Sequence, residues 1–166
     1  MKKNYHSSNL SLKSCLLAAI IITSLLLSTS KSQSYNYWGQ LPSPAANNIN
    51  IVSVDDQDIL FAGLWGEGLY RSEDDGQTWS EVNDGLTNFY IKAIEYDSSG
   101  NVLVGTLGGG VFKSTTGGLS WEEINTGLAD LKVKALTVDE NGNYFAGTMG
   151  RGVYKSTDEG ESWIQA

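Results

Sequence analysis

The chain has 166 residues, with 11 basic and 19 acidic side chains, one His and one Cys. Its net charge of −8 at pH 7 repels the phosphate backbones of DNA and RNA, so nucleic-acid binding has little physical support.

The first 30 residues have the order of a secretory signal peptide. Lys2, Lys3 and Lys13 form a basic start, residues 16–27 are almost entirely apolar, and a run of small residues follows. The apolar run is shorter than the roughly 20 residues of a transmembrane helix. We therefore expect cleavage near residues 30–32, with an uncleaved anchor as the alternative. We also expect a secreted or periplasmic protein of bacterial origin that works outside the cytoplasm.

Cleavage removes the only His and the only Cys, which are His6 and Cys15. Three of the 11 basic residues leave with them, so 8 basic residues face 19 acidic ones in the remaining chain, a net charge of −11. A Cys/His zinc site, a Cys nucleophile and a Ser-His-Asp triad are then excluded. We expect no cofactor and no metal ion.

The remaining chain repeats itself with a period of 42 residues. Each copy ends in a short phrase of Ser, Gly and hydroxyl residues that closes on Trp79, Trp121 or Trp163. A glycine-rich block precedes each phrase. A period near 40, held through three copies without an insertion, is typical of β-propeller blades.

Each copy reads as four short strands separated by turn signals. The predicted strands are 49–54, 59–64, 69–72 and 79–82 in the first copy, 91–96, 102–107, 111–114 and 121–124 in the second, and 133–138, 144–149, 153–156 and 163–165 in the third. The Gly-x-Gly turn before each third strand needs glycine, because tight hairpins place central residues at positive φ. The fold class predicted is all-β: an incomplete propeller of three four-stranded blades.

The predicted organisation has three parts: a signal peptide (1–30), an N-terminal segment (31–48), and three blades at about 49–90, 91–132 and 133–166. Within the second part, Trp38 to Leu41 echoes the start of a fourth strand, so we expect an outer-strand remnant there. Three blades are fewer than the four to eight that close a propeller ring. The chain is thus expected to be a piece of a longer propeller or to associate with itself.

The repeated phrase resembles the Asp-box, or bacterial neuraminidase repeat, whose pattern is Ser/Thr-x-Asp-x-Gly-x-Thr/Ser-Trp. The matching residues are Ser72, Asp74, Gly76, Thr78 and Trp79, then Ser114, Gly118, Ser120 and Trp121, then Ser156, Asp158, Gly160, Ser162 and Trp163. The second copy has Thr116 in the Asp position. Similar blades occur in sialidases, xyloglucanases, sortilin-like receptors and photosystem II stability and assembly factors. The Gly-Thr-x-Gly-x-Gly phrasing is closer to the last three than to the sialidases.

The box residues are interpreted as structural. A short carboxylate can accept backbone N–H groups in a tight turn, and each Trp is expected to pack beneath its hairpin. Thr116 favours this interpretation, because a hydroxyl can partly replace a turn acceptor but not a catalytic carboxylate. The resemblance to sialidases implies three arginines around a substrate carboxylate, and only Arg71 and Arg151 are present.

Two further patterns are interpreted as turn formers. Asp55, Asp97 and Asp139 follow each first strand at the 42-residue period, and a residue copied into every blade rarely carries catalysis. The segment 139–143 also resembles half of a calcium loop, but it lacks the distal bidentate Glu.

Candidate binding residues are those that depart from the repeat at the end of the blades that carries the Gly-x-Gly turns. They are Trp65, Glu67, Phe89, Tyr90, Asp130 and Arg151. The aromatic residues could form a platform for a sugar ring or a peptide, or Trp65 could simply pack between blades like Leu107 and Met149. Two functions stay open. The leading hypothesis is a non-catalytic module that binds a protein or glycan partner. The alternative is the N-terminal lobe of a secreted glycoside hydrolase of the xyloglucanase type whose second carboxylate lies in missing blades; Glu67 and Asp130 are then the best candidates for the carboxylate in this chain.

Overall fold

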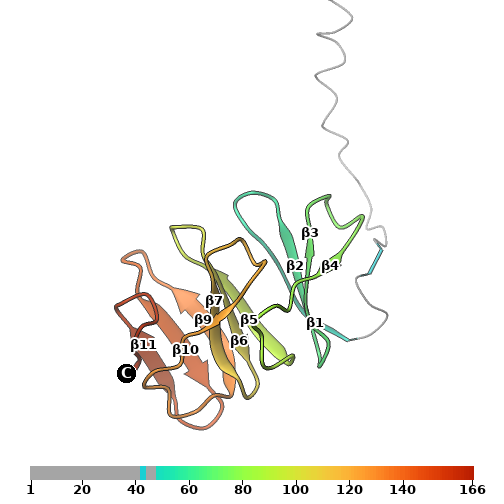
Figure 1. Ribbon diagram of the computed structural model, residues 1–166. Coiled ribbons are helices and arrows are strands. Elements are labelled where there is room, and N and C mark those ends of the chain that lie inside the picture. Colours follow the sequence, from blue (N-terminus) through green and yellow to red (C-terminus); the bar gives the residue numbers. More distant parts are fainter. Residues whose placement is uncertain (1–41, 44–47) are drawn as a thin grey trace, which may run out of the picture. The chain divides into compact units, whose positions relative to one another are not determined.

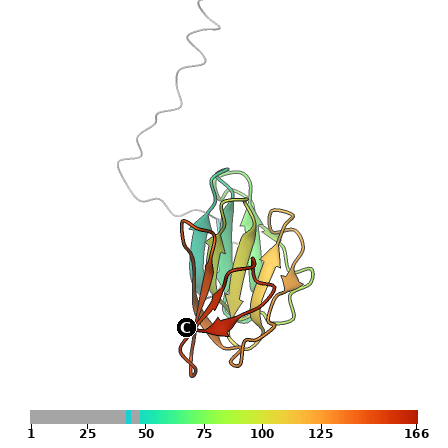
Figure 2. The same ribbon diagram turned by 90° about the vertical axis from the view of Figure 1, so that its left-hand side faces the viewer.

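The structure is a computed structural model that describes residues 42–43 and 48–166. These residues form three four-stranded antiparallel sheets without a helix (Figures 1 and 2). The predicted all-β array of three propeller blades is therefore confirmed. The proposed signal peptide and the outer strand expected at 38–41 lie outside the described residues. Within the described part of the chain, nothing has the length and apolar character of a membrane-spanning helix.

Each sheet is a simple meander in which every strand pairs with the next one in the chain. Blade 1 contains β1 (Ile49–Val54), β2 (Leu60–Leu64), β3 (Gly68–Ser72) and β4 (Ser80–Glu81). Blade 2 contains β5 (Ile91–Tyr96), β6 (Val102–Thr106), β7 (Gly110–Ser114) and β8 (Glu122–Glu123). Blade 3 contains β9 (Val133–Val138), β10 (Tyr144–Thr148), β11 (Val153–Ser156) and β12 (Ile164–Gln165).

The first strand of each blade has the predicted bounds, whereas the fourth strand is shorter than predicted. It begins one residue after the Trp and spans two residues in each blade. In blades 2 and 3 the strand begins after the Trp because the Trp backbone N–H donates to the loop that follows the preceding blade. Trp121 N donates to the carbonyl of Asp84 at 2.9 Å, and Trp163 N donates to the carbonyl of Thr126 at 2.8 Å.

The three blades pack face to face through two apolar clusters. The first joins blades 1 and 2 and is built from Phe61, Leu69, Val82, Leu86, Ile91, Ile94, Val102, Val104, Phe112 and Trp121. The second joins blades 2 and 3 and is built from Leu103, Val111, Leu128, Val133, Tyr144, Ala146, Tyr154 and Trp163. The sheets are mostly buried where another blade covers them, because β-branched and aromatic side chains from both faces interdigitate.

The tryptophans tie each blade to the one before it. The indole N–H of Trp121 donates to the carbonyl of Val82 at 2.8 Å, and that of Trp163 donates to the carbonyl of Ile124 at 2.7 Å. Trp79 makes the same kind of bond to the carbonyl of Pro42 at 3.0 Å. The expectation that each Trp only packs beneath its own hairpin missed this bridging role.

The meander gives the array two ends with different loops. At one end, which we call the loop end, the Gly-x-Gly turns meet the loops between blades: Gly66 N and Gly68 N both donate to the carbonyl of Phe89. At the opposite end, which we call the box end, lie the polar turns after each first strand and the segments that resemble Asp-boxes. A residue that departs from the repeat can therefore be assigned to one end or the other.

Candidate functional site

The side chains of the box motif bond within their own turn. In blade 3, Ser156 Oγ accepts the N–H of Gly160 at 2.8 Å and donates to Asp158 Oδ1 at 2.7 Å. The same carboxylate accepts Ser162 N at 3.0 Å and Ser162 Oγ at 2.6 Å. These bonds lower the pKa of Asp158 to about 2, with the Ser162 hydroxyl as the largest cause. Asp158 is thus a charged turn acceptor.

Blades 1 and 2 repeat this network with one change. Asp74 accepts Thr78 N at 2.8 Å and Thr78 Oγ1 at 2.6 Å, and the hydroxyl bond from Thr78 is the largest cause of its lowered pKa. In blade 2, Thr116 Oγ1 accepts Ser120 N at 3.0 Å and contacts Ser120 Oγ at 3.0 Å. The single Thr hydroxyl therefore makes both contacts that two carboxylate oxygens make in blades 1 and 3.

The polar turns at the box end are built in a similar way. Asp97 Oδ1 accepts the N–H groups of Ser99 and Asn101, both at 2.9 Å. Burial raises the pKa of Asp97, but hydrogen bonds from Tyr144 and Asn101 outweigh burial and lower it overall. Asp55 and Asp139 accept the equivalent backbone pairs in blades 1 and 3. No group of three or more His, Cys, Asp or Glu side chains that could hold a metal ion occurs in residues 42–43 and 48–166.

The two arginines named in the sequence analysis are far apart in the fold. Arg71 lies on β3 beside the box end and pairs with Glu73. Arg151 lies in the Gly-x-Gly turn of blade 3, at the loop end. Because they belong to different blades and opposite ends, they do not form a shared carboxylate clamp.

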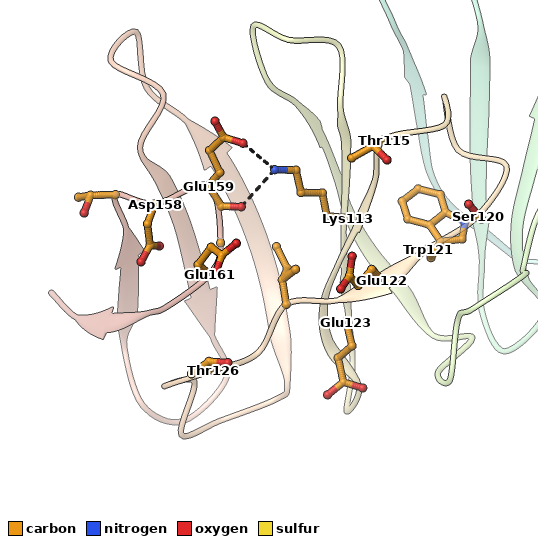
Figure 3. Close-up of a pocket in the computed structure, with 13 residues that line it drawn as sticks. Lys113, Thr115, Ser120, Trp121, Glu122, Glu123, Thr126, Asp158, Glu159 and Glu161 are labelled. Atoms are coloured by element: carbon orange, nitrogen blue, oxygen red, sulfur yellow. Dashed lines mark hydrogen bonds and ion pairs between the residues drawn. The ribbon is translucent and has the colours of Figure 1, made fainter.

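A groove of about 700 Å³ lies at the box end between blades 2 and 3 (Figure 3). Lys113 Nζ bridges it to Glu159, with 3.1 Å to the carboxylate and 3.3 Å to the carbonyl oxygen. Its other charged lining residues are acidic: Glu122, Glu123, Asp158 and Glu161. Sequence reasoning did not single out this groove, because its two walls come from different blades.

At the loop end, two of the predicted aromatic residues come together. Trp65 and Tyr90 form an isolated β-bridge, and their rings meet edge to face with centroids 5.3 Å apart at 76°. Trp65 is 44% exposed and Tyr90 is 42% exposed. The same bridge in blade 2 joins Leu107 to Lys132, so the aromatic pair is unique among the described blades. We call it the aromatic pair.

Polar groups that the sequence analysis did not identify surround the aromatic pair. Lys92 Nζ lies 4.3 Å from the centroid of a Trp65 ring and donates to Asn50 Oδ1 at 3.1 Å. A shallow pocket of about 370 Å³ beside Trp65 is lined by Asn48, Ile49 and Asn50. Asn50 and Lys92 occupy equivalent positions in successive repeats, and this spacing could have been used to predict that they lie side by side.

The remaining candidates are held apart from the aromatic pair. Phe89 is 43% exposed and contributes its carbonyl to the Gly66 turn, but among the described residues no ring contact joins it to the pair. Glu67 and Arg151 are exposed at the loop end in blades 1 and 3. The predicted platform thus has two aromatic members and one cation.

Asp130 is engaged by backbone rather than open to a ligand. Its Oδ1 accepts Lys132 N at 3.0 Å, and its Oδ2 accepts Gly150 N at 2.8 Å. These two bonds, with the one from Lys132 the larger, lower the pKa of Asp130. Asn88 occupies the equivalent position in the loop between blades 1 and 2 and accepts Tyr90 N at 3.1 Å. Asp130 therefore ties the loop between blades to the turn of blade 3.

Comparison with solved structures places these blades among propeller proteins. The extracellular domain of the one-component system BT4673 from B. thetaiotaomicron matches 75% of this chain and 19% of its own, with 18% identity and a TM-score of 0.61. YCF48 from Cyanidioschyzon merolae matches 76% of this chain and 39% of its own, with 19% identity and a TM-score of 0.61. The GH74 xyloglucanase from Xanthomonas campestris matches 71% of this chain and 23% of its own, with 17% identity and a TM-score of 0.57.

These similarities establish the propeller fold. The chain spans well under half the length of each of these three proteins. No protein-family description matches the chain. No curated protein sequence matches it.

Proposed function

We propose that this chain is a non-catalytic propeller module that binds a protein or glycan partner outside the cytoplasm through its loop end. The observation that carries this proposal is the aromatic pair, Trp65 and Tyr90, which breaks the repeat and stays more than 40% exposed. An aromatic residue that packs only between blades would be covered by its neighbours, as Trp121 and Trp163 are at 7% and 3% exposure.

The surroundings of the pair are those of a binding surface. A flat apolar ring edged by polar groups can stack on a sugar ring or a peptide side chain while amides fix its orientation. Lys92 brings a cation to a chain that is otherwise strongly acidic, and Asn48 and Asn50 bring amide groups. This combination suits a partner with both an apolar face and hydrogen-bonding groups.

The hydrolase alternative rests on the xyloglucanases among the similar structures and on Glu67 and Asp130. A glycoside hydrolase needs one carboxyl that keeps its proton and one that is ready to act as base or nucleophile. Both oxygens of Asp130 are occupied by backbone N–H groups, and its lowered pKa disfavours the protonated form. This argues against Asp130 as the acid and favours the binding module.

Several similar structures are extracellular domains, which supports a place outside the cytoplasm. Another similar structure is that of YCF48 bound to D1 peptide, so a propeller of this fold can hold a peptide. We take a peptide and a glycan as the two partner classes to test.

The test is a binding measurement on the full chain with two probes, xyloglucan oligosaccharides and a set of extended peptides of mixed charge. Trp65→Ala or Tyr90→Ala is expected to weaken binding to the recognised probe by about 2 kcal/mol, roughly 30-fold, because the aromatic pair supplies the central contact. Titration calorimetry measures the change.

Met149→Ala is the matched control. Met149 holds the position of Trp65 in blade 3 and is 58% exposed, so its removal takes apolar surface from the same repeat position. Binding that survives Trp65→Ala and Tyr90→Ala but falls with Met149→Ala would place the partner elsewhere and contradict the proposal.

A further inference from the structure

The two outer faces of the array expose positions that are buried wherever a neighbouring blade is present. On blade 3, Val153 is 46% exposed, while its repeat counterparts Val111 and Leu69 are fully buried. On blade 1, Ile49 is 46% exposed, while its counterparts Ile91 and Val133 are fully buried. The exposed face of blade 3 thus corresponds to the faces of blades 1 and 2 that the next blade covers. The exposed face of blade 1 corresponds to the faces of blades 2 and 3 that pack onto the preceding blade.

A glycine in each second strand shows how one blade fits onto the next. A Cβ on Gly63 would lie 2.5 Å from Cγ2 of Ile91, and one on Gly105 would lie 2.8 Å from Cγ1 of Val133. Each β-branched side chain therefore fills the space above a glycine of the preceding blade. Gly147 is the third glycine of this set, and its nearest neighbour is Ala135 Cβ at 3.5 Å. The space above Gly147 is open. Ile49 is the repeat counterpart of Ile91 and Val133, so it is the side chain expected to fill this space.

The charges at the two faces are also complementary. Between blades 2 and 3, Lys113 pairs with Glu159 at 3.1 Å. The repeat counterpart of Lys113 on the open face of blade 3 is Lys155, and the counterpart of Glu159 in blade 1 is Asp75. Asp75 and Glu159 share the same left-handed backbone, with φ of 57° and 56°. Blade 1 docked on blade 3 would therefore place Asp75 beside Lys155, just as blade 3 places Glu159 beside Lys113 of blade 2.

We propose that two copies of this chain dock head to tail, with blade 1 of each copy on the open face of blade 3 of the other. Such a contact joins two different surfaces, so it closes only if the rotation completes a ring. Two copies supply six blades, which is within the four to eight that close a propeller, whereas three copies would supply nine. A second copy is the occupant we choose, because its blade 1 carries both Ile49 and Asp75.

The docked contact is made by the three inner strands, β9 to β11 against β1 to β3. The indole N–H of Trp79 already has a carbonyl partner in its own chain, Pro42, where Trp121 and Trp163 use Val82 and Ile124 of the preceding blade. On docking, the element that would have to shift is β12, which is two residues long and in which Ile164 is 67% exposed.

The experiment is sedimentation equilibrium on the full chain and four variants. The unchanged chain should have twice the 18.0 kDa mass of one copy. Lys155→Glu should raise the dissociation constant by about tenfold or more, because it sets two acids against each other, and Lys155→Glu with Asp75→Lys should restore it. Gly147→Leu should abolish pairing, because the new side chain fills the space for Ile49. The single chain should tolerate this change, since a Cβ at position 147 would lie 3.5 Å from its nearest neighbour.

Lys132→Glu is the control for the change of charge, because Lys132 lies in the loop between blades 2 and 3 and not on the open face. All variants share residues 1–47, so differences between them report on the faces alone. A monomeric unchanged chain overturns the proposal. So does association that Gly147→Leu leaves intact, or a loss with Lys155→Glu that Asp75→Lys does not restore.

Discussion

At the scale of single residues, one position separates the three box motifs. Positions 74 and 158 hold a carboxylate that accepts both the backbone N–H and the hydroxyl four residues later. Position 116 holds Thr, whose single oxygen serves both contacts. The box turns of blades 1 and 3 therefore contain charge-assisted hydrogen bonds, which are stronger than the neutral hydrogen bonds in the box turn of blade 2.

Thr116→Asp is expected to stabilise the chain at pH 7, with a rise of about 3 °C in thermal midpoint. Ser114 and Ser120 already offer the donors that correspond to those of Ser156 and Ser162, which bond to Asp158 in blade 3. A carboxyl whose folded pKa is lowered stabilises the fold above its unfolded pKa of about 4. The gain should be complete at pH 7 and vanish as the pH falls toward 2, as the pKa of about 2 for Asp158 indicates.

Calorimetric scans of the variant and the unchanged chain at pH 7 and pH 3 measure this gain. Thr116→Val is the control, because it keeps the shape of the side chain but cannot accept a hydrogen bond. A midpoint that rises equally at both pH values would mean that the carboxylate charge is not the cause.

At the scale of strands and blades, the loops between blades are fitted to the tryptophans. Gly85 has φ of 86°, and a Cβ there would lie 2.1 Å from the carbonyl oxygen of Trp121. Gly127 has the same relation to Trp163 at 2.2 Å. The Gly-Leu loops therefore need glycine for two reasons: the left-handed backbone and the close approach of the next blade.

Gly85→Ala is expected to destabilise the chain by roughly 3 kcal/mol or more, because the new methyl group collides with backbone that cannot move away cheaply. Gly100→Ala is the matched control. Gly100 has a similar φ of 80° with nothing within 4 Å of its Cβ position, so only the strain of about 1–2 kcal/mol remains. Urea unfolding of both variants gives the comparison, and equal losses would show that the approach of Trp121 contributes nothing.

The repeat made the strands predictable from sequence, and it also sets the limit of that prediction. A period of 42 residues fixes strand order, turns and ends, so the first strands and the two ends of the array were predicted correctly. Contacts between blades were not. The Trp121 bond to Val82 and the Lys92 contact with Trp65 join residues of different copies, and these depend on how the blades face each other. The contact of Trp65 with Tyr90 was one of two alternatives that the sequence left open, and the hydrogen bond from Gly150 to Asp130 was not predicted.

At the scale of the whole molecule, the described residues form a propeller segment with one distinctive surface. The box end repeats the same turn chemistry in every blade apart from Thr116, whereas the loop end carries the aromatic pair and the non-repeated charges. Because propellers host unrelated functions on one fold, the residues at the loop end decide the function, and not the fold itself.

The measurement that tests the proposed function most directly is the release of reducing sugar from xyloglucan by the full chain, beside binding of the same polymer. A non-catalytic module is expected to give no release above the buffer blank, with or without Glu67→Gln or Asp130→Asn. Release by the unchanged chain that either substitution abolishes would contradict the account and establish the hydrolase.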